Sequence, residues 1–331
     1  MSGPLRKGPR ITRRAFVALG AVAGGAVLPA WGQKYPDKPI RLVVPFAVGG
    51  GTDILARDLA PRLAEALGQP VVVENKGGAG GNLGADAVAK SAADGYSVLF
   101  GSNTLSINAA LYQKLPFDPV HAFAPVGTVA TAPLVLVVHP DAGLQSVRDL
   151  VREAKARPGQ LNWSAPGNGT PHHLASELFN RMTGSDIVHI QYKGGGPAIN
   201  DLLGRQTQAS FQTVASVRSF IAAGRLRALG VAAAQRTPLL PEVPTIAEAG
   251  VPGYEVNLWY GLFAPAGTPA AAVQALNAAL NQVLADPAVQ AKFNSQGYEL
   301  RPGRPDALRT LYTEDLARSA KVVAEANIKA D

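Results

Sequence analysis

The chain has 331 residues and a formal net charge of +7, and 47% of its residues are hydrophobic. This length and apolar content suit one large domain or two ordinary ones, and they exclude a disordered or collagen-like chain. The first 32 residues hold five basic residues and no acidic one; removing these five from the 31 basic residues leaves 26 against 24 acidic ones. A nearly neutral body lacks the basic face that nucleic-acid binding needs, so we predict no nucleic-acid partner. The absence of cysteine excludes disulfides and Cys-ligated metals.

Residues 1–32 have the anatomy of a cleaved signal peptide. A basic region precedes an apolar run from Phe16 to Pro29, and Ala30-Trp31-Gly32 places small residues where a signal peptidase requires them. The segment 12–16, Thr-Arg-Arg-Ala-Phe, resembles a twin-arginine export signal. An uncleaved membrane anchor is the alternative, but the run is short for a hydrocarbon core of ~30 Å. We therefore predict an exported protein of the periplasm.

The chain after the leader alternates between strand and helix patterns, beginning with a short apolar run at 40–46. Such runs are typical of strands buried in a parallel sheet. The first series continues with a strand at 71–74, a glycine-rich turn at 77–81, a helix near 82–91 and a strand at 97–100. This alternation predicts an α/β fold with parallel strand pairs.

The first helix of this series follows the glycines at 49–51. Thr52 or Asp53 can cap it, and its apolar side carries leucines at intervals of four residues from 55 to 67. Gly68 is expected to end the helix. Pro61 lies inside the pattern and is expected to kink or interrupt it, because an interior proline costs ~3 kcal/mol.

A second alternating series begins with a strand at 134–139. It continues with a helix from Ser146, strands at 162–164, 188–192, 207–214 and 226–231, and helices at 171–182, 197–204 and 216–223. An apolar stretch at 259–263 and helices from Thr268 and Pro305 follow. Two series predict two lobes, with the chain crossing near 131–134 and near 252–258 and the C-terminal helices returning to the first lobe. We expect lobe one to comprise 33–132 plus 256–331, and lobe two 133–255.

Catalytic and cofactor motifs are missing from the sequence. It contains no Gly-x-Ser-x-Gly elbow and no His-Glu-x-x-His. Lys76 precedes its glycines, which breaks the phosphate-loop pattern. Leu83 occupies the third glycine position of a dinucleotide fingerprint, where a bulky side chain blocks close helix–strand packing. We predict no catalytic residues and no cofactor.

His172, His173 and Glu177 form the best metal candidate in the sequence. His173 and Glu177 are four residues apart and would share a helix face. A zinc site normally needs three or four ligands, and no further ligand is evident. We therefore interpret this segment as a polar helix start and predict no metal site. His121, His139 and His189 are isolated, which is typical of structural histidines.

Two strand-to-helix loops share a glycine-rich pattern, at 49–53 and at 164–171. Glycines let a ligand approach the backbone, and a helix N-terminus offers free N–H groups and about half a positive charge. Pro171 suits the first turn of a helix. Each N–H bond to a charged oxygen is worth ~1.5–3 kcal/mol, so three or four would give about micromolar affinity for a carboxylate after binding entropy. Ser102-Asn103-Thr104 would add side-chain donors. The alternative is that all three loops are ordinary connections.

The same segments carry a resemblance to a known family. The matching blocks run in order over nearly the whole mature chain, at 35–40, 43–53, 73–82, 94–96, 164–173, 192–195, 244–250, 259–262 and 264–269. In this ordered set the chain resembles the periplasmic solute-binding proteins of the tripartite tricarboxylate transporter family, the Bug-type receptors.

This resemblance implies a type II periplasmic-binding-protein architecture, a Venus flytrap of two α/β lobes joined by hinge strands. It implies a non-catalytic receptor that holds a carboxylate by backbone amides, hydroxyls and water, and delivers it to the permease subunits of a transporter. Separately, we expect a monomer. Family ligands include di- and tricarboxylates, acidic amino acids and aromatic acids.

One departure and two particular roles refine the candidate site. Family members often have an acidic residue after the Phe of the 207–214 strand, whereas this chain has Gln212, which weakens the case for an amino-acid ligand. Phe46 is expected to shape the pocket, and Asp53 is better suited to a helix cap than to contact with a carboxylate it would repel. The candidate ligand-binding residues are Phe46, Gly50, Gly51, Thr52, Asp53, Ser102, Asn103, Thr104, Ser164, Gly167, Asn168, Gly169, Thr170, His172 and Gln212.

Two alternative functions remain open from the sequence. An exported α/β enzyme acting on a carboxylate would need an acid–base pair in the cleft, such as Asp53 with His172. A sensor protein would pass its liganded state to a signalling partner instead of a permease.

Overall fold

The computed structural model describes residues 3, 35–325 and 327–329. Apart from Gly3, the predicted signal peptide lies outside the described residues, and so do residues 33 and 34 of the predicted first lobe. Across the described part, no helix combines the length and apolar character that a membrane span requires.

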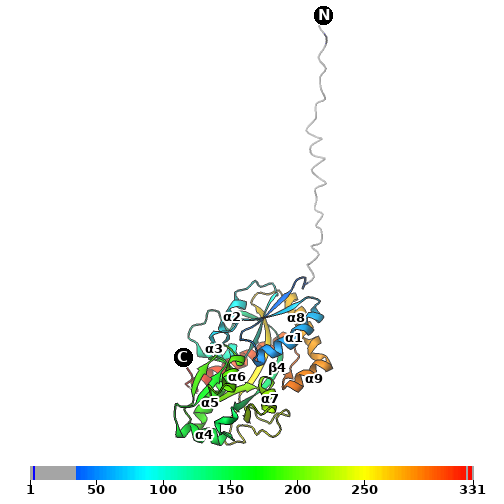
Figure 1. The fold of residues 1–331 in the computed structure, drawn as a ribbon. Coiled ribbons are helices and arrows are strands. Elements are labelled where there is room, and N and C mark those ends of the chain that lie inside the picture. Colours follow the sequence, from blue (N-terminus) through cyan, green and yellow to red (C-terminus); the bar gives the residue numbers. More distant parts are fainter. Residues whose placement is uncertain (1–2, 4–34, 326, 330–331) are drawn as a thin grey trace. The chain divides into compact units, whose positions relative to one another are not determined.

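The described chain is a mixed α/β fold with two sheets, as the sequence predicts (Figure 1). Sheet A has the order β2-β1-β3-β9-β4, with the short strand β10 also on β4. Sheet B has the order β4-β7-β5-β6, with β8 also on β4. The strands are β1 (Ile40–Val44), β2 (Val71–Asn75), β3 (Ser97–Ser102), β4 (Phe123–Val138), β5 (Asn162–Ala165), β6 (Val188–Gln191), β7 (Ala209–Thr213), β8 (Arg227–Val231), β9 (Asn257–Pro265) and β10 (Glu299–Leu300).

Helices surround both sheets. The helices are α1 (Gly51–Leu67), α2 (Asn82–Ala89), α3 (Thr104–Leu111), α4 (Val147–Ala156), α5 (Pro171–Thr183), α6 (Gly195–Leu203), α7 (Val214–Ala222), α8 (Ala270–Ala285), α9 (Pro287–Gln296) and α10 (Pro305–Glu325), with 3-10 turns at Ala79–Gly81 and Pro140–Ala142. Helices α1, α2 and α8 lie around sheet A, and α4, α5 and α7 around sheet B (Figure 1). We call sheet A with its helices the first lobe and sheet B with its helices the second lobe.

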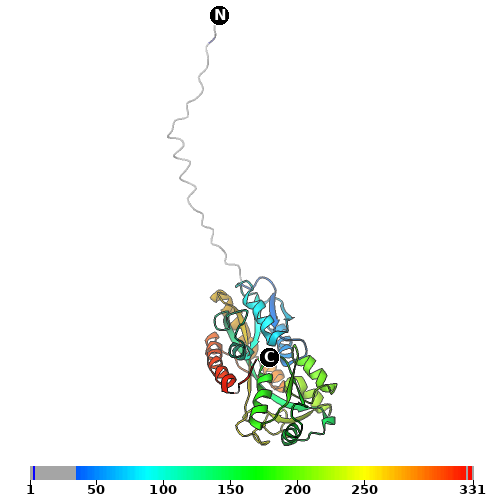
Figure 2. The same cartoon turned by 90° about the vertical axis from the view of Figure 1, so that its left-hand side faces the viewer.

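Strand β4 belongs to both sheets. Its residues 123–133 pair with β9 in sheet A, and Leu134–Val138 pair with β7 in sheet B. The crossing therefore lies within the predicted 131–134. After the second lobe the chain returns through β9 to sheet A, and α10, red in Figure 2, packs on α3 and β4. The exact lobe boundaries stay a prediction.

Several local predictions need correction. The N-cap of α1 is Gly50, without a side-chain cap, so neither Thr52 nor Asp53 occupies that position. The helix continues through Pro61 to Leu67 and ends, as expected, at a left-handed Gly68 with φ 67°. Strand β4 begins at Phe123, eleven residues before the predicted strand.

The early part of β4 was missed because proline and glycine interrupt its apolar pattern. Pro125 and Gly127 flank a register shift against β9, and a second shift follows between Thr128 and Ala130. Bulges of this kind accommodate a proline that cannot donate to the ladder. The interruption is therefore local, and the strand continues into sheet B.

Candidate ligand-binding site

Four helices begin at one small cavity between the lobes. Its lining includes the first residues of α1, α3, α5 and α6, namely Gly51, Thr104, Pro171 and Gly195. Each helix N-terminus carries roughly half a positive charge and unpaired backbone donors. Of the described residues that line the cavity, none is Lys, Arg, Asp or Glu. The site is therefore electropositive through backbone dipoles alone, which suits an anion that accepts hydrogen bonds.

Side chains add neutral polar groups to these termini. Thr52, Ser102 and Thr104 line the cavity, and the Ser102 hydroxyl donates to Thr104 Oγ1 at 3.0 Å. Gln212 Nε2 donates to Ser210 Oγ at 2.8 Å, which fixes the amide with its Oε1 toward Gly195. These hydrogen bonds orient the polar side chains within the cavity.

His172 also lines the cavity and is half-buried. Burial lowers the pKa of its imidazole from 6.5 to about 4, because the charged form loses its hydration. The ring is therefore neutral near pH 7. Its Nδ1 is buried and finds no hydrogen-bond partner in the described chain. His172 thus offers a neutral polar contact, not a positive charge.

Asp53 holds the first glycine loop in place. Its carboxylate accepts hydrogen bonds from Gly49 N at 3.0 Å, Arg57 Nε at 2.9 Å and Asn75 Nδ2 at 2.8 Å. The residue is 4% exposed and does not line the cavity. Its role in the structure is to fix the start of α1, where a carboxylate is also favoured by the helix dipole.

The structure brings eight of the predicted ligand-binding residues to the cavity and places seven elsewhere. The glycine-rich loops at 49–53 and 164–171 are therefore not equivalent. Those at the cavity are Phe46, Gly50, Gly51, Thr52, Ser102, Thr104, His172 and Gln212. Those outside its lining are Asp53, Asn103, Ser164, Gly167, Asn168, Gly169 and Thr170.

The 167–170 loop meets the other lobe. Gly167 lies against Gly80, and a Cβ on Gly80 would overlap the Asn168 carbonyl oxygen. Thr170 caps α5, since its Oγ1 accepts from His173 N at 3.2 Å. Asn103 Nδ2 donates to Asn257 O, at the start of β9, at 2.8 Å. These residues position the site and its surroundings without lining the cavity.

Sequence reasoning missed four lining residues, Pro166, Pro171, Gly195 and Leu258. Gly195 had a usable signal, because Gly194-Gly195-Gly196 precedes a helix just as the glycines at 49–51 do. The two prolines lie in the loop already singled out. Leu258 sits on β9 in an apolar strand, where nothing local distinguishes it from core.

Glycines let the lobes approach closely at this cavity. A Cβ on Gly195 would lie 3.0 Å from the Gly50 Cα, and a Cβ on Gly77 would lie 2.7 Å from the Lys193 carbonyl oxygen. Ala47 N donates across the same boundary to Lys193 O at 2.9 Å. The cavity has a free volume of about 20 Å³, which is room for about one water. The two lobes are therefore in a closed arrangement.

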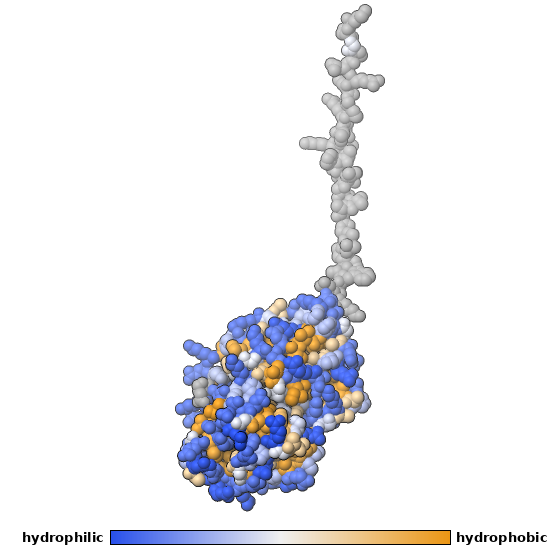
Figure 3. Space-filling model, in the orientation of Figure 1, coloured by the Kyte–Doolittle hydropathy of each residue, from blue (hydrophilic) through white to orange (hydrophobic). Residues whose placement is uncertain are grey.

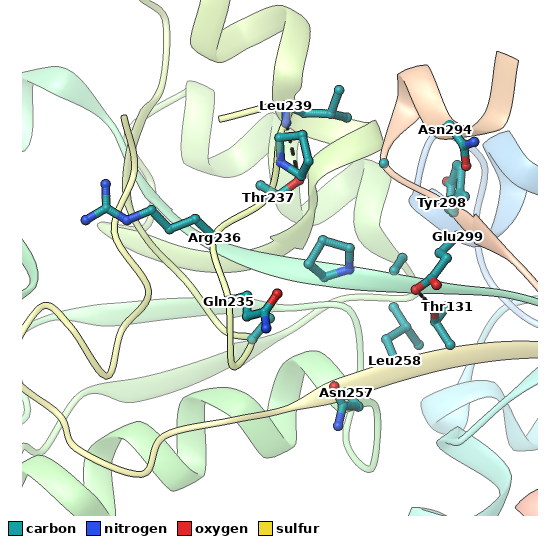
Figure 4. Close-up of a pocket in the computed structure, with 15 residues that line it drawn as sticks. Thr131, Gln235, Arg236, Thr237, Leu239, Asn257, Leu258, Asn294, Tyr298 and Glu299 are labelled. Carbon is teal, nitrogen blue, oxygen red and sulfur yellow. Dashed lines mark hydrogen bonds between the residues drawn. The ribbon is translucent and has the colours of Figure 1, made fainter. Parts of the chain in front are cut away.

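A wider cavity of about 480 Å³ lies beside the crossover strands (Figure 4). Thr131 and Leu258 line it from β4 and β9, and the 235–239 segment lines it from the second lobe. Its charged groups are already paired: Arg236 with Glu248, and Glu299 with Arg301, each at 2.9 Å. No helix N-terminus opens into it among the lining residues. This cavity is wider than the one between the helix N-termini, but the chemistry of anion binding favours the smaller one.

On the outer surface, apolar and polar residues are mixed. In Figure 3 hydrophobic residues form patches among hydrophilic ones on the face viewed. Exposed large hydrophobic residues are scattered over several elements, as is common on soluble proteins: Val48, Val72, Leu83, Val120, Met182, Val188 and Ile190.

Comparison with known proteins places the chain in a family and a fold. A family model described as "Tripartite tricarboxylate transporter family receptor" matches residues 55–328. The solved structure of the periplasmic binding protein BugD superposes with a TM-score of 0.87 at 34% identity, covering 90% of this chain and 100% of that one. Rpa4515 of R. palustris with adipate has a TM-score of 0.86 at 37% identity, with 89% and 99% covered. MatC from Rhodopseudomonas palustris with bound malate has a TM-score of 0.84 at 33% identity, with 87% and 100% covered.

Proposed function

Since this chain belongs to the tripartite tricarboxylate transporter receptor family, we propose that it captures a small aliphatic dicarboxylate between its lobes and delivers it to the membrane subunits of a transporter. The observation that carries this proposal is the convergence of four helix N-termini on a cavity lined by neutral residues. Backbone N–H groups at such termini bind carboxylate oxygens without a compensating basic side chain.

Two kinds of observation support a dicarboxylate as the ligand. Adipate and malate, bound by two of the similar proteins, are both aliphatic dicarboxylates. An acidic amino acid would bring an ammonium group, and the lining residues include no carboxylate to pair with it. Gln212, the residue expected from sequence to disfavour an amino acid, lies in the cavity lining.

The remaining features of this proposal concern organisation and place. We propose lobe bounds of 33–132 plus 256–331 and 133–255, export to the periplasm with cleavage before Gln33, and a monomeric receptor without catalytic activity or cofactor. An enzymatic role finds no support in Asp53, because its carboxylate is buried in hydrogen bonds to Gly49, Arg57 and Asn75, away from the cavity. Transfer to a sensor instead of a permease would show as a ligand-dependent complex with a signalling domain.

The test is a thermal-shift screen of protein beginning at Gln33, unfolded and refolded to remove co-purified ligand. Succinate, malate and adipate are compared with a tricarboxylate, glutamate and benzoate. A specific ligand at 100 times its Kd adds ~2.7 kcal/mol to the stability. We expect a shift with dicarboxylates. Folded, ligand-free protein that shifts with none of these compounds would overturn the carboxylate proposal.

A variant pair then tests the site itself. Ser102→Ala removes a hydroxyl from the cavity, and a hydrogen bond to a charged group is worth ~1.5–3 kcal/mol, or about 10- to 150-fold in Kd. Ser91→Ala is the matched control, because its hydroxyl donates to Val88 O at 2.8 Å and does not line the cavity. Equal affinities for the two variants would place the ligand elsewhere.

A further inference from the structure

Helix α5 and strand β6 bring together two histidines and a glutamate in the second lobe. His173 and Glu177 lie one helical turn apart on α5, and His189 lies on β6. One potential ligand atom from each residue falls within 4.8 Å of the other two. From the sequence we interpret His172, His173 and Glu177 as a polar helix start without a metal, and His189 as a structural histidine. The fold instead brings His189 together with His173 and Glu177.

The side chains of β6 explain why His189 faces the helix. Alternate residues of a strand point to opposite faces. Val188 and Ile190 are exposed at 41% and 38%, so the intervening His189 points inward, where its side chain is 9% exposed. The His173 side chain is 1% exposed and Glu177 is 31% exposed. The cluster is thus buried on the histidine side and open to solvent at the carboxylate.

The distances fit a tetrahedral ion. His173 Nε2 lies 3.5 Å from Glu177 Oε1, and His189 Nδ1 lies 3.3 Å from the same oxygen. Metal–ligand bonds of about 2.1 Å in a tetrahedron separate neighbouring ligand atoms by about 3.4 Å. Two of the three edges therefore already have the required length, and the two imidazoles meet edge to face with centroids 5.0 Å apart.

A buried nitrogen with a weak partner points into this cluster. Among the described residues, His173 Nε2 meets only Glu177 Oε1, at 3.5 Å, which is long for a hydrogen bond. A buried polar atom without a good partner costs free energy, and such atoms call for a physical explanation. A bound cation at this position would satisfy it and would also neutralise the Glu177 carboxylate.

Hydrogen bonds behind the cluster orient the His189 ring for metal binding, whereas the hydrogen bond to His173 Nδ1 has to break. His189 Nε2 lies 2.8 Å from Ser176 Oγ, and a proton on Nε2 in that contact would leave the Nδ1 lone pair directed toward Glu177, 3.3 Å away. His173 Nδ1 accepts from Gly169 N at 3.4 Å. Ligation through Nε2 moves the proton to Nδ1, so this long contact must open. Binding therefore displaces Gly169 slightly, a cost that lowers the affinity without removing a ligand.

We propose that His173, Glu177 and His189 form a binding site for a divalent transition-metal ion, with Zn²⁺ as the best match. Two imidazoles, one carboxylate and a water complete a four-coordinate zinc shell. None of the three residues lines the carboxylate cavity, so the site is separate from the one described above.

The test measures metal binding to tag-free protein after treatment with a chelator. Zn²⁺ is titrated by calorimetry, and Co²⁺ is titrated by its visible absorption, which distinguishes four-coordinate from octahedral ions. We expect one Zn²⁺ per chain and an intense, low-coordinate Co²⁺ spectrum. Losing an outer-shell partner of a metal costs ~10- to 100-fold in affinity, so Glu177→Gln and His189→Gln, which remove direct ligands, should each weaken binding by at least that much. His189→Gln can keep the contact to Ser176 while removing the ligand atom.

His121→Gln is the matched control, because this histidine is 80% exposed in its side chain and its ring lies 2.9 Å from Asp118 Oδ2, away from the cluster. It should bind Zn²⁺ as the unchanged protein does. Circular dichroism in the absence of metal checks that each variant is folded, and the partly exposed Glu177 position provides a variant that keeps the fold if His189→Gln does not. Equal Zn²⁺ affinity in the unchanged protein and Glu177→Gln, or an octahedral Co²⁺ spectrum in both, would overturn the proposal.

Discussion

Gly196 offers a direct test of whether the closed arrangement is the ligand-bound one. It lies in the first turn of α6, and a Cβ there would overlap the Val48 carbonyl oxygen of the other lobe and lie 3.3 Å from the Gly49 Cα. Its φ is outside the left-handed region, so alanine fits the backbone itself. The substitution Gly196→Ala thus perturbs the approach of the lobes and little else.

The magnitude follows from the overlap. Forcing an extra carbon into a packed contact typically costs ~1–3 kcal/mol. In the open form this cost is absent, and alanine in a helix is favoured over glycine by ~1 kcal/mol. The free energy of unfolding should therefore be kept or raised, while closure becomes less favourable. Because closure and binding are linked, we expect the dicarboxylate Kd to rise about 5- to 150-fold.

The assay combines calorimetric titration of the dicarboxylate with small-angle scattering in the presence and absence of it. Gly204→Ala is the control: it caps the other end of α6, with φ −81°, and its Cβ would meet only atoms of its own lobe, the nearest being Asn200 O at 3.3 Å. We expect the scattering of Gly196→Ala to remain that of the more open form at ligand concentrations that close the control. A folded Gly196→Ala that binds like the control would refute the identification of this closed contact with the bound state.

Two further predictions concern residues around the cavity. Asp53→Asn removes the charge that pairs with Arg57 and weakens the acceptor for Gly49 N. The free energy of unfolding, measured with urea, should therefore fall by ~1–3 kcal/mol. An unchanged urea midpoint would contradict the role of Asp53 in holding the glycine loop. For His172, burial lowers the pKa in the folded protein to about 4, below the 6.5 of an unfolded chain, so stability present above pH 6.5 is lost as the pH falls toward 4. Relative to His172→Gln, the unchanged protein should lose roughly 2–3 kcal/mol between pH 7 and pH 4.5, and parallel pH profiles for the two proteins would show that this histidine is not the cause.

The fold was largely accessible from sequence because its buried strands and amphipathic helices have strong local patterns. Helix α3 was missed, since the sequence from Thr104 to Leu111 lacks a polar face: most of its residues are buried, including Ser106 and Asn108. A helix enclosed on all sides has no periodic contrast to detect. Its polar side chains instead meet tertiary partners: the Ser106 hydroxyl donates to Asp315 of α10, and Asn108 Nδ2 donates to Gly80 O.

The site was accessible only in part, for a geometric reason. Glycine-rich loops that follow strands can be found from sequence, but which of them face the ligand and which face the opposite lobe depends on how the lobes meet. The 167–170 loop contacts Gly80 and Asn108, whereas Gly195 reaches the cavity. The contact between His173 and His189 could not be predicted for a similar reason. These residues are sixteen positions apart, and they come together because β6 pairs with β5.

The composition of the cavity separates affinity from selectivity. Helix N-termini and hydroxyls bind any carboxylate. A Cβ added at Gly50 or Gly195 would lie about 3 Å from the opposing backbone, where the lobes meet. It should therefore weaken the binding of every dicarboxylate by a similar factor. Phe46 and Leu258 are the apolar side chains of the lining beyond the prolines, and we expect them to contact the carbon chain of the ligand rather than its charged ends. Leu258→Ala should therefore change the order of preference between malate and adipate, favouring the longer ligand, because one deleted side chain enlarges the space for methylene groups worth ~0.8 kcal/mol each. Competition between malate and adipate measures the ratio of their Kd values. If Leu258→Ala leaves this ratio unchanged while Gly195→Ala weakens both ligands equally, the preference for chain length is set by residues other than Leu258.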